Sequence, residues 1–173
     1  MHLTIAHRTA NSALMTIAKV REAVLGGIDN PSDAIIPFGQ TLYRTAHARR
    51  YVAGRYDTNA PEAAYASCWW ATSDDYLAAT WFSQSPSLST AARQAFAIHP
   101  AWRSDCASVT SVVPLVDLSV WYGLGKTITA DDPATLRPLT MPASADILQI
   151  YIPGFEENFA KWARLGKTVP FGS

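Results

Sequence analysis

The pattern of hydrophobic and polar positions predicts a helix at the start of the chain, followed by a β-rich region. Apolar side chains recur at helical spacing through residues 11–25, and the glycine pair that follows is a typical helix stop. Turn-forming residues cluster next, and residues 41–46 then predict a short strand rich in β-formers. The alternation of a strand places Leu42 and Arg44 of this segment on the same face.

The middle of the chain alternates predicted strands with predicted helices. Residues 64–72 predict a strand, and residues 74–83 predict a helix with two acids in its first turn, where the helix dipole favours negative charge. A second short helix is predicted at residues 90–98, and a β-branched strand at residues 107–113. A strand, a polar turn and a helix therefore follow one another directly in residues 64–83.

The C-terminal third is predicted to hold a loop, a core strand and one more element. Several prolines make residues 127–144 typical of a loop. Residues 146–152 predict a strand that ends at a Pro-Gly pair. The pattern of residues 156–165 fits either a helix or a strand.

Length and composition favour one domain that spans residues 1–173. With 49% hydrophobic residues the chain can bury a substantial core, and the helical segment within residues 1–33 is expected to pack on it. Lysine plus arginine equals aspartate plus glutamate at 14 each, so no net charge attracts nucleic acid or an anionic membrane. There is no apolar run of about 18 residues and no signal-peptide pattern. The expectation is a cytoplasmic protein, or a secreted effector without a cleaved signal peptide.

Metal and phosphate-loop chemistry have no support in the sequence. The four histidines lack zinc-binding spacing and have no cysteine near enough to help, so no metal site is predicted. The segment GLGKT at residues 123–127 has the ending of a phosphate-binding loop, but Val120 stands where that motif requires a glycine.

Two tryptophans indicate a slot for a flat ligand. Trp70, at the end of a predicted strand, and Trp81, in the next predicted helix, are eleven residues apart. If the helix folds back across the strand, the two rings face each other, and stacking on both faces holds a flat heterocycle well. This segment resembles the NAD-binding core of the ADP-ribosyltransferases related to diphtheria toxin and exotoxin A, with tryptophan at both places where that family usually has tyrosine. The resemblance implies that Trp70 and Trp81 sandwich nicotinamide, and that Thr72 belongs to the NAD site.

A second part of the resemblance lies near the C-terminus. That family has a catalytic glutamate, a tryptophan five residues later and then a strand with a basic-Thr-Val sequence, and this chain has Glu157, Trp162 and residues 167–169 (KTV). The resemblance implies that Glu157 is catalytic. A carboxylate beside the ribose stabilises the positive charge that develops as the nicotinamide bond breaks. The neighbouring Glu156 is the alternative carboxylate.

The third part is the strand that contains Arg44 and Thr45. Arg44 stands where the diphtheria-toxin class has histidine. The other large branch of ADP-ribosyltransferases has an arginine at this place in its first strand. The resemblance implies that its guanidinium holds NAD through paired hydrogen bonds to phosphate or ribose. Thr45 takes the place of a glycine whose backbone grips the carboxamide.

These three resemblances imply an α+β fold with a split, mostly antiparallel β-core and flanking helices, and with NAD in its central cleft. The implied activity is NAD-dependent mono-ADP-ribosyl transfer by a bacterial toxin or effector. The acceptor is an unknown macromolecule or small molecule, and an antitoxin or immunity protein is an expected partner.

Two alternatives remain open. The segments LYR at residues 42–44 and GRYD at residues 54–57 resemble the opening of RES-domain toxins, which degrade NAD, although the glutamate of their next helix is missing. The tryptophans fit a core role equally, and Glu156 and Glu157 fit a solvated helix start paired with Lys161. The chain is then a non-catalytic binding or immunity protein, in which Glu157 points away from the aromatic slot.

Overall fold

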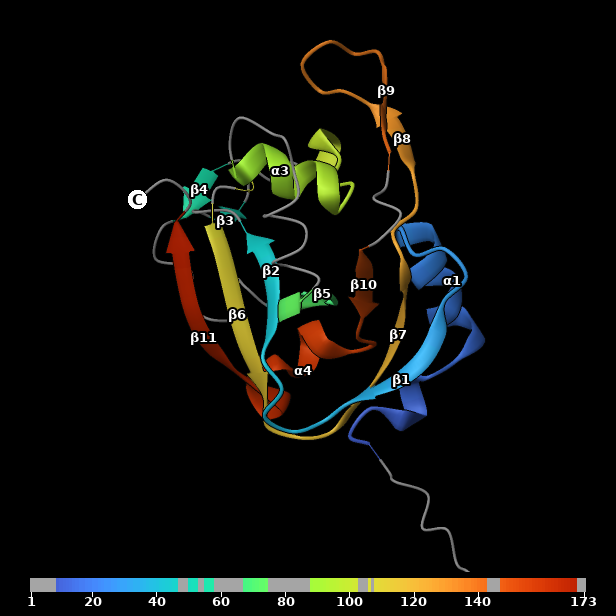
Figure 1. Ribbon diagram of the computed structural model, residues 1–173, viewed down its shortest axis with the longest axis vertical. Helices are drawn as coiled ribbons and strands as arrows, with labels where there is room; N and C mark the ends of the chain where they lie inside the picture. Colours follow the sequence, from blue (N-terminus) through green and yellow to red (C-terminus); the bar gives the residue numbers. More distant parts are fainter. Residues whose placement is uncertain are drawn as a thin grey trace, which may run out of the picture.

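Seven strands form the central sheet, in the order β1-β7-β10-β5-β2-β6-β11 (Figure 1). Their bounds are β1 Ser32–Ile36, β2 Leu42–Ala46, β5 Trp69–Thr72, β6 Ser108–Pro114, β7 Leu118–Leu124, β10 Leu148–Tyr151 and β11 Ala163–Pro170. Every neighbouring pair is antiparallel. This computed structural model describes residues 9–46, 50–52, 55–57, 67–74, 88–102, 106, 108–142 and 147–170. Within them the prediction of an α+β fold with a mostly antiparallel sheet is confirmed.

The short strand β5 joins the two halves of the sheet. On one side it pairs with β10 through Trp70 with Ile150 and Trp69 with Tyr151. On the other side it pairs with β2 at only two positions, Leu42 with Thr72 and Tyr43 with Ala71. The strands β1, β7 and β10 therefore lie on one side of β5, and β2, β6 and β11 lie on the other (Figure 1).

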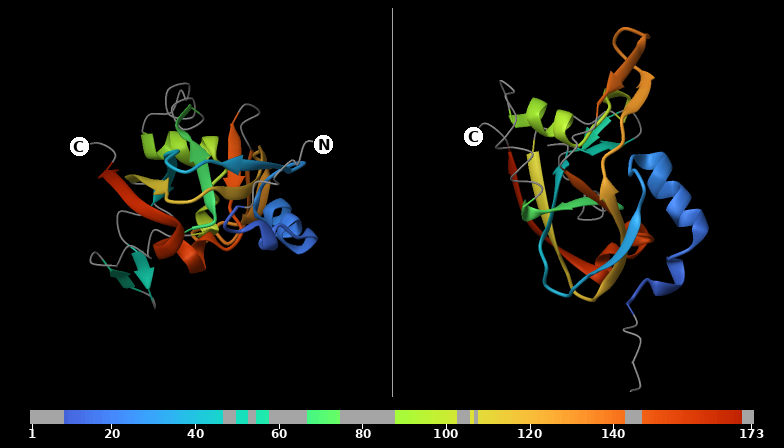
Figure 2. Two further views of the ribbon diagram at one scale, coloured as in Figure 1. Left: turned by 90° about the horizontal axis from the view of Figure 1, so that it is seen from below. Right: turned by 45° about the vertical axis from the view of Figure 1, so that its right-hand side comes forward.

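The helices lie outside this sheet. Those whose full length lies in the described part of the chain are the short 3-10 helices η1 (Ser12–Leu14) and η3 (Pro100–Trp102) and the α-helices α1 (Ile17–Gly26), α3 (Leu88–Ala95) and α4 (Phe155–Trp162). The helix predicted at residues 11–25 is divided, because Thr16 accepts a hydrogen bond from the Lys19 amide and so begins a new helix. Figure 2 shows α1 along the edge of the sheet that carries β1 and β7. No helix in the described part of the chain is long and apolar enough to cross a membrane.

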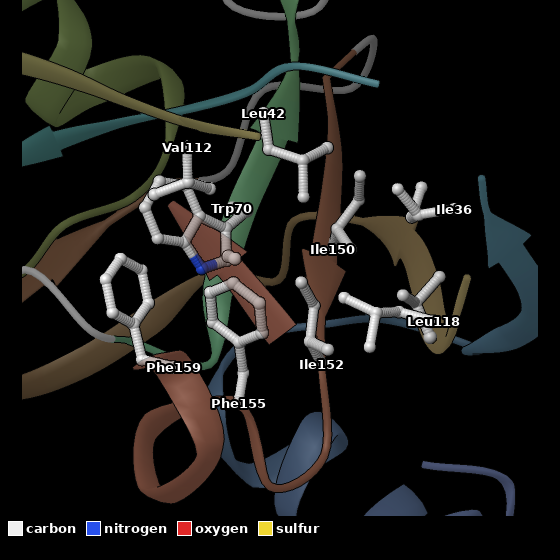
Figure 3. Packing of buried hydrophobic residues seen from close by; sticks show 11 residues of the cluster. Ile36, Leu42, Trp70, Val112, Leu118, Ile150, Ile152, Phe155 and Phe159 are labelled. Carbon is white, nitrogen blue, oxygen red and sulfur yellow. The ribbon is translucent and has the colours of Figure 1, made fainter. Parts of the chain in front are cut away.

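The main core lies between the sheet and α4. Phe155 and Phe159 pack edge to face at 5.6 Å between ring centroids, and Phe155 meets Trp70 edge-on at 5.8 Å (Figure 3). Apolar side chains from five strands complete the cluster: Ile36, Leu42, Val112, Leu118, Val120 and Ile150. Burial of this face anchors α4, whose polar residues Glu156 and Glu157 face solvent.

The prediction of a loop at residues 127–144 is wrong. Strands β8 (Ile128–Asp131) and β9 (Pro138–Met141) form an antiparallel hairpin that projects from the body of the molecule (Figures 1 and 2). The prolines are compatible with it, because Pro138 is the first residue of its strand and Pro133 lies in the connecting turn. A further hairpin joins β3 (Arg50–Val52) to β4 (Arg55–Asp57).

Other elements differ from the predictions at their ends. Strand β5 begins at Trp69, because Ser67 and Cys68 before it form no ladder. The ambiguous segment 156–165 is helix as far as Trp162 and strand from Ala163, so both alternatives hold in part. In the helix predicted at residues 74–83, Asp74 is helical and the remaining residues lie outside the described part.

Candidate ligand-binding site

A pocket of about 530 Å³ opens where β2 and β5 separate. The two strands are paired only as far as Tyr43 and Ala71. The next residues on β2, Arg44 and Thr45, line the pocket, and so do Trp70 and Trp69 on β5. A strand edge without a partner presents backbone hydrogen-bonding groups. Within the described residues the pocket therefore has unpaired strand edges on two sides, and the end of α1 and the segment after α3 close it further.

Arg44 is the only charged residue among the described residues that line this pocket. Its Nε donates to the Thr45 carbonyl oxygen at 3.3 Å, and its Cζ lies 5.7 Å from the centroid of the Trp70 ring. Burial lowers the pKa of Arg44 to about 10, an effect that the negative charge of Glu156 opposes. The guanidinium is therefore charged at neutral pH. Within the described residues it forms no ion pair, so it can hold an anionic group of a ligand.

Trp70 is mainly a core residue. It is 3% exposed, its edge contacts Phe155, and its indole N–H donates to the Ser67 carbonyl oxygen at 2.5 Å. Trp70 lines the pocket next to Arg44. The structure thus brings three of the residues predicted for the NAD site, Arg44, Thr45 and Trp70, to one pocket.

The outcome is different for Thr72 and Trp81, the two other residues predicted for the NAD site. Thr72 is half-buried at the end of β5, opposite Leu42, and does not line the pocket. Trp81 lies outside the described residues, so the sandwich of nicotinamide between Trp70 and Trp81 stays a prediction.

The predicted catalytic carboxylate lies in the first turn of α4. Glu157 and its neighbour Glu156 are both exposed, and neither lines the pocket. The first turn of a helix favours acidic residues through the helix dipole, so this position needs no ligand to explain it. The catalytic role of Glu157 stays a prediction.

The sequence did not indicate eight of the residues that line the pocket, among them Trp69, Gly26 and Gln149. Trp69 and Trp70 are adjacent in a strand, so their side chains point to opposite faces of the sheet. That alternation was readable in the sequence, but the contact of both indoles with one pocket was not. Gln149 lies on β10, where its Nε2 donates to the Phe96 carbonyl oxygen at 3.1 Å and fixes the amide at the pocket wall.

The described residues contain no group of three or more histidine, cysteine, aspartate or glutamate side chains that could hold a metal ion. Among them, His99 is fully buried in a structural role. Its Nδ1 accepts from the Ala101 amide at 3.0 Å, and its Nε2 lies 3.1 Å from the Leu139 carbonyl oxygen. His99 therefore ties the segment after α3 to the β8–β9 hairpin.

Comparison with known proteins gives structural matches only. No family model and no curated protein matches the chain. A chain in the complex of Rhs1-CT with its cognate immunity protein RhsI1 is 13% identical, with 85% of this chain and 86% of that chain covered and a TM-score of 0.49. A chain in the complex of Tne2 with Tni2 is 14% identical, with 82% of this chain and 92% of that chain covered and a TM-score of 0.50. This chain shares the fold of that second protein.

Proposed function

We propose that the chain is an NAD-cleaving toxin, an ADP-ribosyltransferase in kind, that is controlled by a cognate immunity protein. The observation that carries the proposal is the pocket at the split between β2 and β5, with the Arg44 guanidinium as its one charge among the described lining residues. An arginine that forms no ion pair with the described residues suits the pyrophosphate of a dinucleotide, because the planar fork binds phosphate oxygens in pairs.

The other residues of the pocket fit the nicotinamide end of NAD. The unpaired edges of β2 and β5 offer backbone donors and acceptors for a carboxamide, and indole rings offer a surface for a flat heterocycle. The described residues that line the pocket do not supply the catalytic carboxylate of the proposal. The resemblance assigns that role to Glu157, outside the pocket in α4, which would stabilise positive charge on the ribose as the bond to nicotinamide breaks. An acceptor molecule or water then takes the ADP-ribose.

The expected protein partner follows from the shared fold. The Tne2 structure is a complex with a second protein, Tni2, and the matched chain is covered over 92% of its length. Carried over to this chain, that arrangement supports a complex with a second protein, and in the proposal that second protein is a cognate immunity protein.

Release of nicotinamide from NAD tests this proposal directly. The purified chain is incubated with NAD, with and without a cell extract as a source of acceptors, and free nicotinamide is measured. Release without the extract indicates hydrolysis, as in the RES-like alternative, whereas release that requires the extract, with label transferred from NAD, indicates ADP-ribosyl transfer. Absence of release under both conditions, with a folded protein, contradicts the enzymatic proposal.

The two neighbouring glutamates provide a matched pair of variants. Glu157→Gln is expected to lower the rate of nicotinamide release about a hundredfold or more, because it removes a charge used in the transition state and keeps the side-chain volume. Glu156→Gln, equally exposed in the same helical turn, is expected to have little effect. The opposite result assigns the reaction to Glu156.

A second candidate function is a non-catalytic binding or immunity protein with the same fold. The exposed position of Glu157, outside the pocket, favours this candidate specifically. It predicts NAD binding that depends on Arg44, with no nicotinamide release by the wild-type chain and no effect of Glu157→Gln.

A further inference from the structure

We propose that Trp69, and not Trp70, is the side chain that stacks on the planar ring of the bound ligand, a heteroaromatic ring linked to phosphate, as in a nucleotide. The assignment refines the site of the proposed function and rests on that function only for the choice of NAD as the first probe. It follows from the contacts of the two indoles within the protein and from the polar groups around them.

The Trp70 ring is already engaged within the protein. Its edge packs against Phe155, its indole N–H is bound to the Ser67 carbonyl, and the Arg44 guanidinium lies over the ring. With 3% of its surface exposed, it has little area left for a ligand. Figure 3 shows Trp70 among the core side chains above α4.

Trp69 points to the other face of the sheet and is only half-buried. Its ring lies 5.0 Å from the ring of Tyr151, tilted by 54°. The end of α1 approaches it so closely that a Cβ on Gly26 would lie 2.1 Å from Cζ2 of the indole. Contacts with β10 and with α1 therefore hold the Trp69 ring in place, and this ring forms a rigid wall of the pocket.

The polar groups near this wall fit a heteroaromatic ring better than a plain aromatic one. Thr45 and the amide of Gln149 line the same pocket, and that amide is oriented by its hydrogen bond to the Phe96 carbonyl. They suit an edge with donors and acceptors, such as a carboxamide or an exocyclic amine. Arg44 suits a phosphate attached to the ring through a sugar.

Calorimetric titration of the full chain with NAD, nicotinamide and AMP tests the assignment. Trp69→Leu is expected to weaken binding of the ring about fivefold or more, which corresponds to loss of one stacked aromatic contact. Trp162→Phe is the matched control, because Trp162 is a partly buried indole that packs against the main core and does not line the pocket. It is expected to leave binding unchanged, and Trp70→Phe is expected to lower stability far more than affinity.

A second variant tests the wall from the other side and does not remove the indole. Gly26→Ala adds a Cβ that displaces the end of the Trp69 ring towards the pocket, in a helical position where alanine is favourable. We expect a folded protein with a lower melting temperature than the wild type, because the supported indole must shift, and at least about fivefold weaker ring binding, a drop set by the same stacking contact. This variant keeps the assignment testable if Trp69→Leu fails to fold.

The outcomes separate this assignment from the proposed function. If AMP binds in a Trp69-dependent way and NAD and nicotinamide do not bind, the assignment stands and the NAD proposal fails. If NAD binds equally well to the wild type, Trp69→Leu and Gly26→Ala, the NAD proposal stands and the assignment is overturned. If none of the three probes binds to the wild type, both are overturned.

Discussion

At the scale of single residues, Arg44 carries most of the electrostatic character of the pocket. Arg44→Lys keeps the charge but loses the planar fork that binds phosphate in pairs. Because the pyrophosphate lies far from the bond that breaks, the contact is expected to be equal in ground and transition states. We therefore expect KM for NAD to rise about tenfold, as for loss of one charged hydrogen bond, with kcat nearly unchanged. Steady-state kinetics of nicotinamide release measures both constants.

The control for that substitution is Arg164→Lys, on an exposed position of β11 that does not line the pocket. It is expected to leave KM and kcat as they are. Binding of free nicotinamide, which has no phosphate, is also expected to be unchanged in Arg44→Lys. An unaltered KM for NAD in Arg44→Lys would show that Arg44 does not bind the dinucleotide and only makes its contacts with Thr45 and Trp70 within the protein.

At the scale of elements, α1 is attached to the sheet by a carboxylate whose charge matters. Glu22 Oε2 accepts from Lys19 Nζ at 2.7 Å and from the Tyr151 hydroxyl at 2.5 Å, and these bonds hold the pKa of Glu22 below its ordinary value of 4.5. A carboxyl with a lowered pKa stabilises the fold above that ordinary value, and the stabilisation is lost as the pH falls through the folded-state pKa.

We therefore expect Tyr151→Phe to lower stability at pH 7 and to have less effect well below pH 4.5, where the carboxyl is protonated in both states. Glu22 is largely solvated, so the difference should stay within about 1 kcal/mol. Urea unfolding at the two pH values measures it, with Glu22→Gln as the control that removes the same dependence. Equal destabilisation by Tyr151→Phe at both values would rule out a charged Glu22 as the cause.

A second prediction at this scale concerns the start of α4. Gly154 has φ of 73°, and a Cβ there would lie 2.3 Å from Leu14 Cδ1. Gly39 has φ of 82° but no atom within 4 Å of the same position. Both Gly→Ala substitutions incur the cost of a left-handed residue, roughly 1–2 kcal/mol, but only Gly154→Ala must also displace the N-terminal segment.

Chemical denaturation of the two variants therefore separates backbone strain from the close contact. Gly154→Ala is expected to lose more stability than Gly39→Ala, by roughly 1 kcal/mol or more, because overpacking adds to the strain. Equal losses would mean that Leu14 moves aside without cost and that η1 is only loosely attached to α4.

At the scale of the whole molecule, the pocket lies between the two halves of the sheet, so a ligand there contacts both. NAD that binds only the folded state raises the free energy of unfolding by about 2.7 kcal/mol at a concentration one hundred times Kd. Thermal unfolding with increasing NAD is expected to show a steady rise in Tm. The rise should be smaller in Arg44→Lys at the same concentration, and no rise in the wild type would contradict binding to the native pocket.

The sequence by itself determined most element types and part of the site. Helical spacing predicted α1 and α3, β-formers predicted β2, β6 and β10, and motif resemblance selected Arg44, Thr45 and Trp70, which the structure brings to one pocket. These features are local: a helix face or a strand face is set by the residues within a few positions of one another. The α+β class and the antiparallel sheet could be inferred for the same reason.

Only the tertiary structure decided where the pocket opens and which of its two indoles is the more exposed. The pairing of Leu42 with Thr72 and Val112, and of Trp70 with Ile150, joins residues far apart in the chain, so no local pattern states where β2 and β5 separate. The hairpin β8–β9 was hidden in the same way, because each of its strands has only four residues, too few for their alternation to stand out among the prolines of this segment. Trp69 became a pocket residue because β10 and α1 pack around it, and those contacts exist only once the chain has folded.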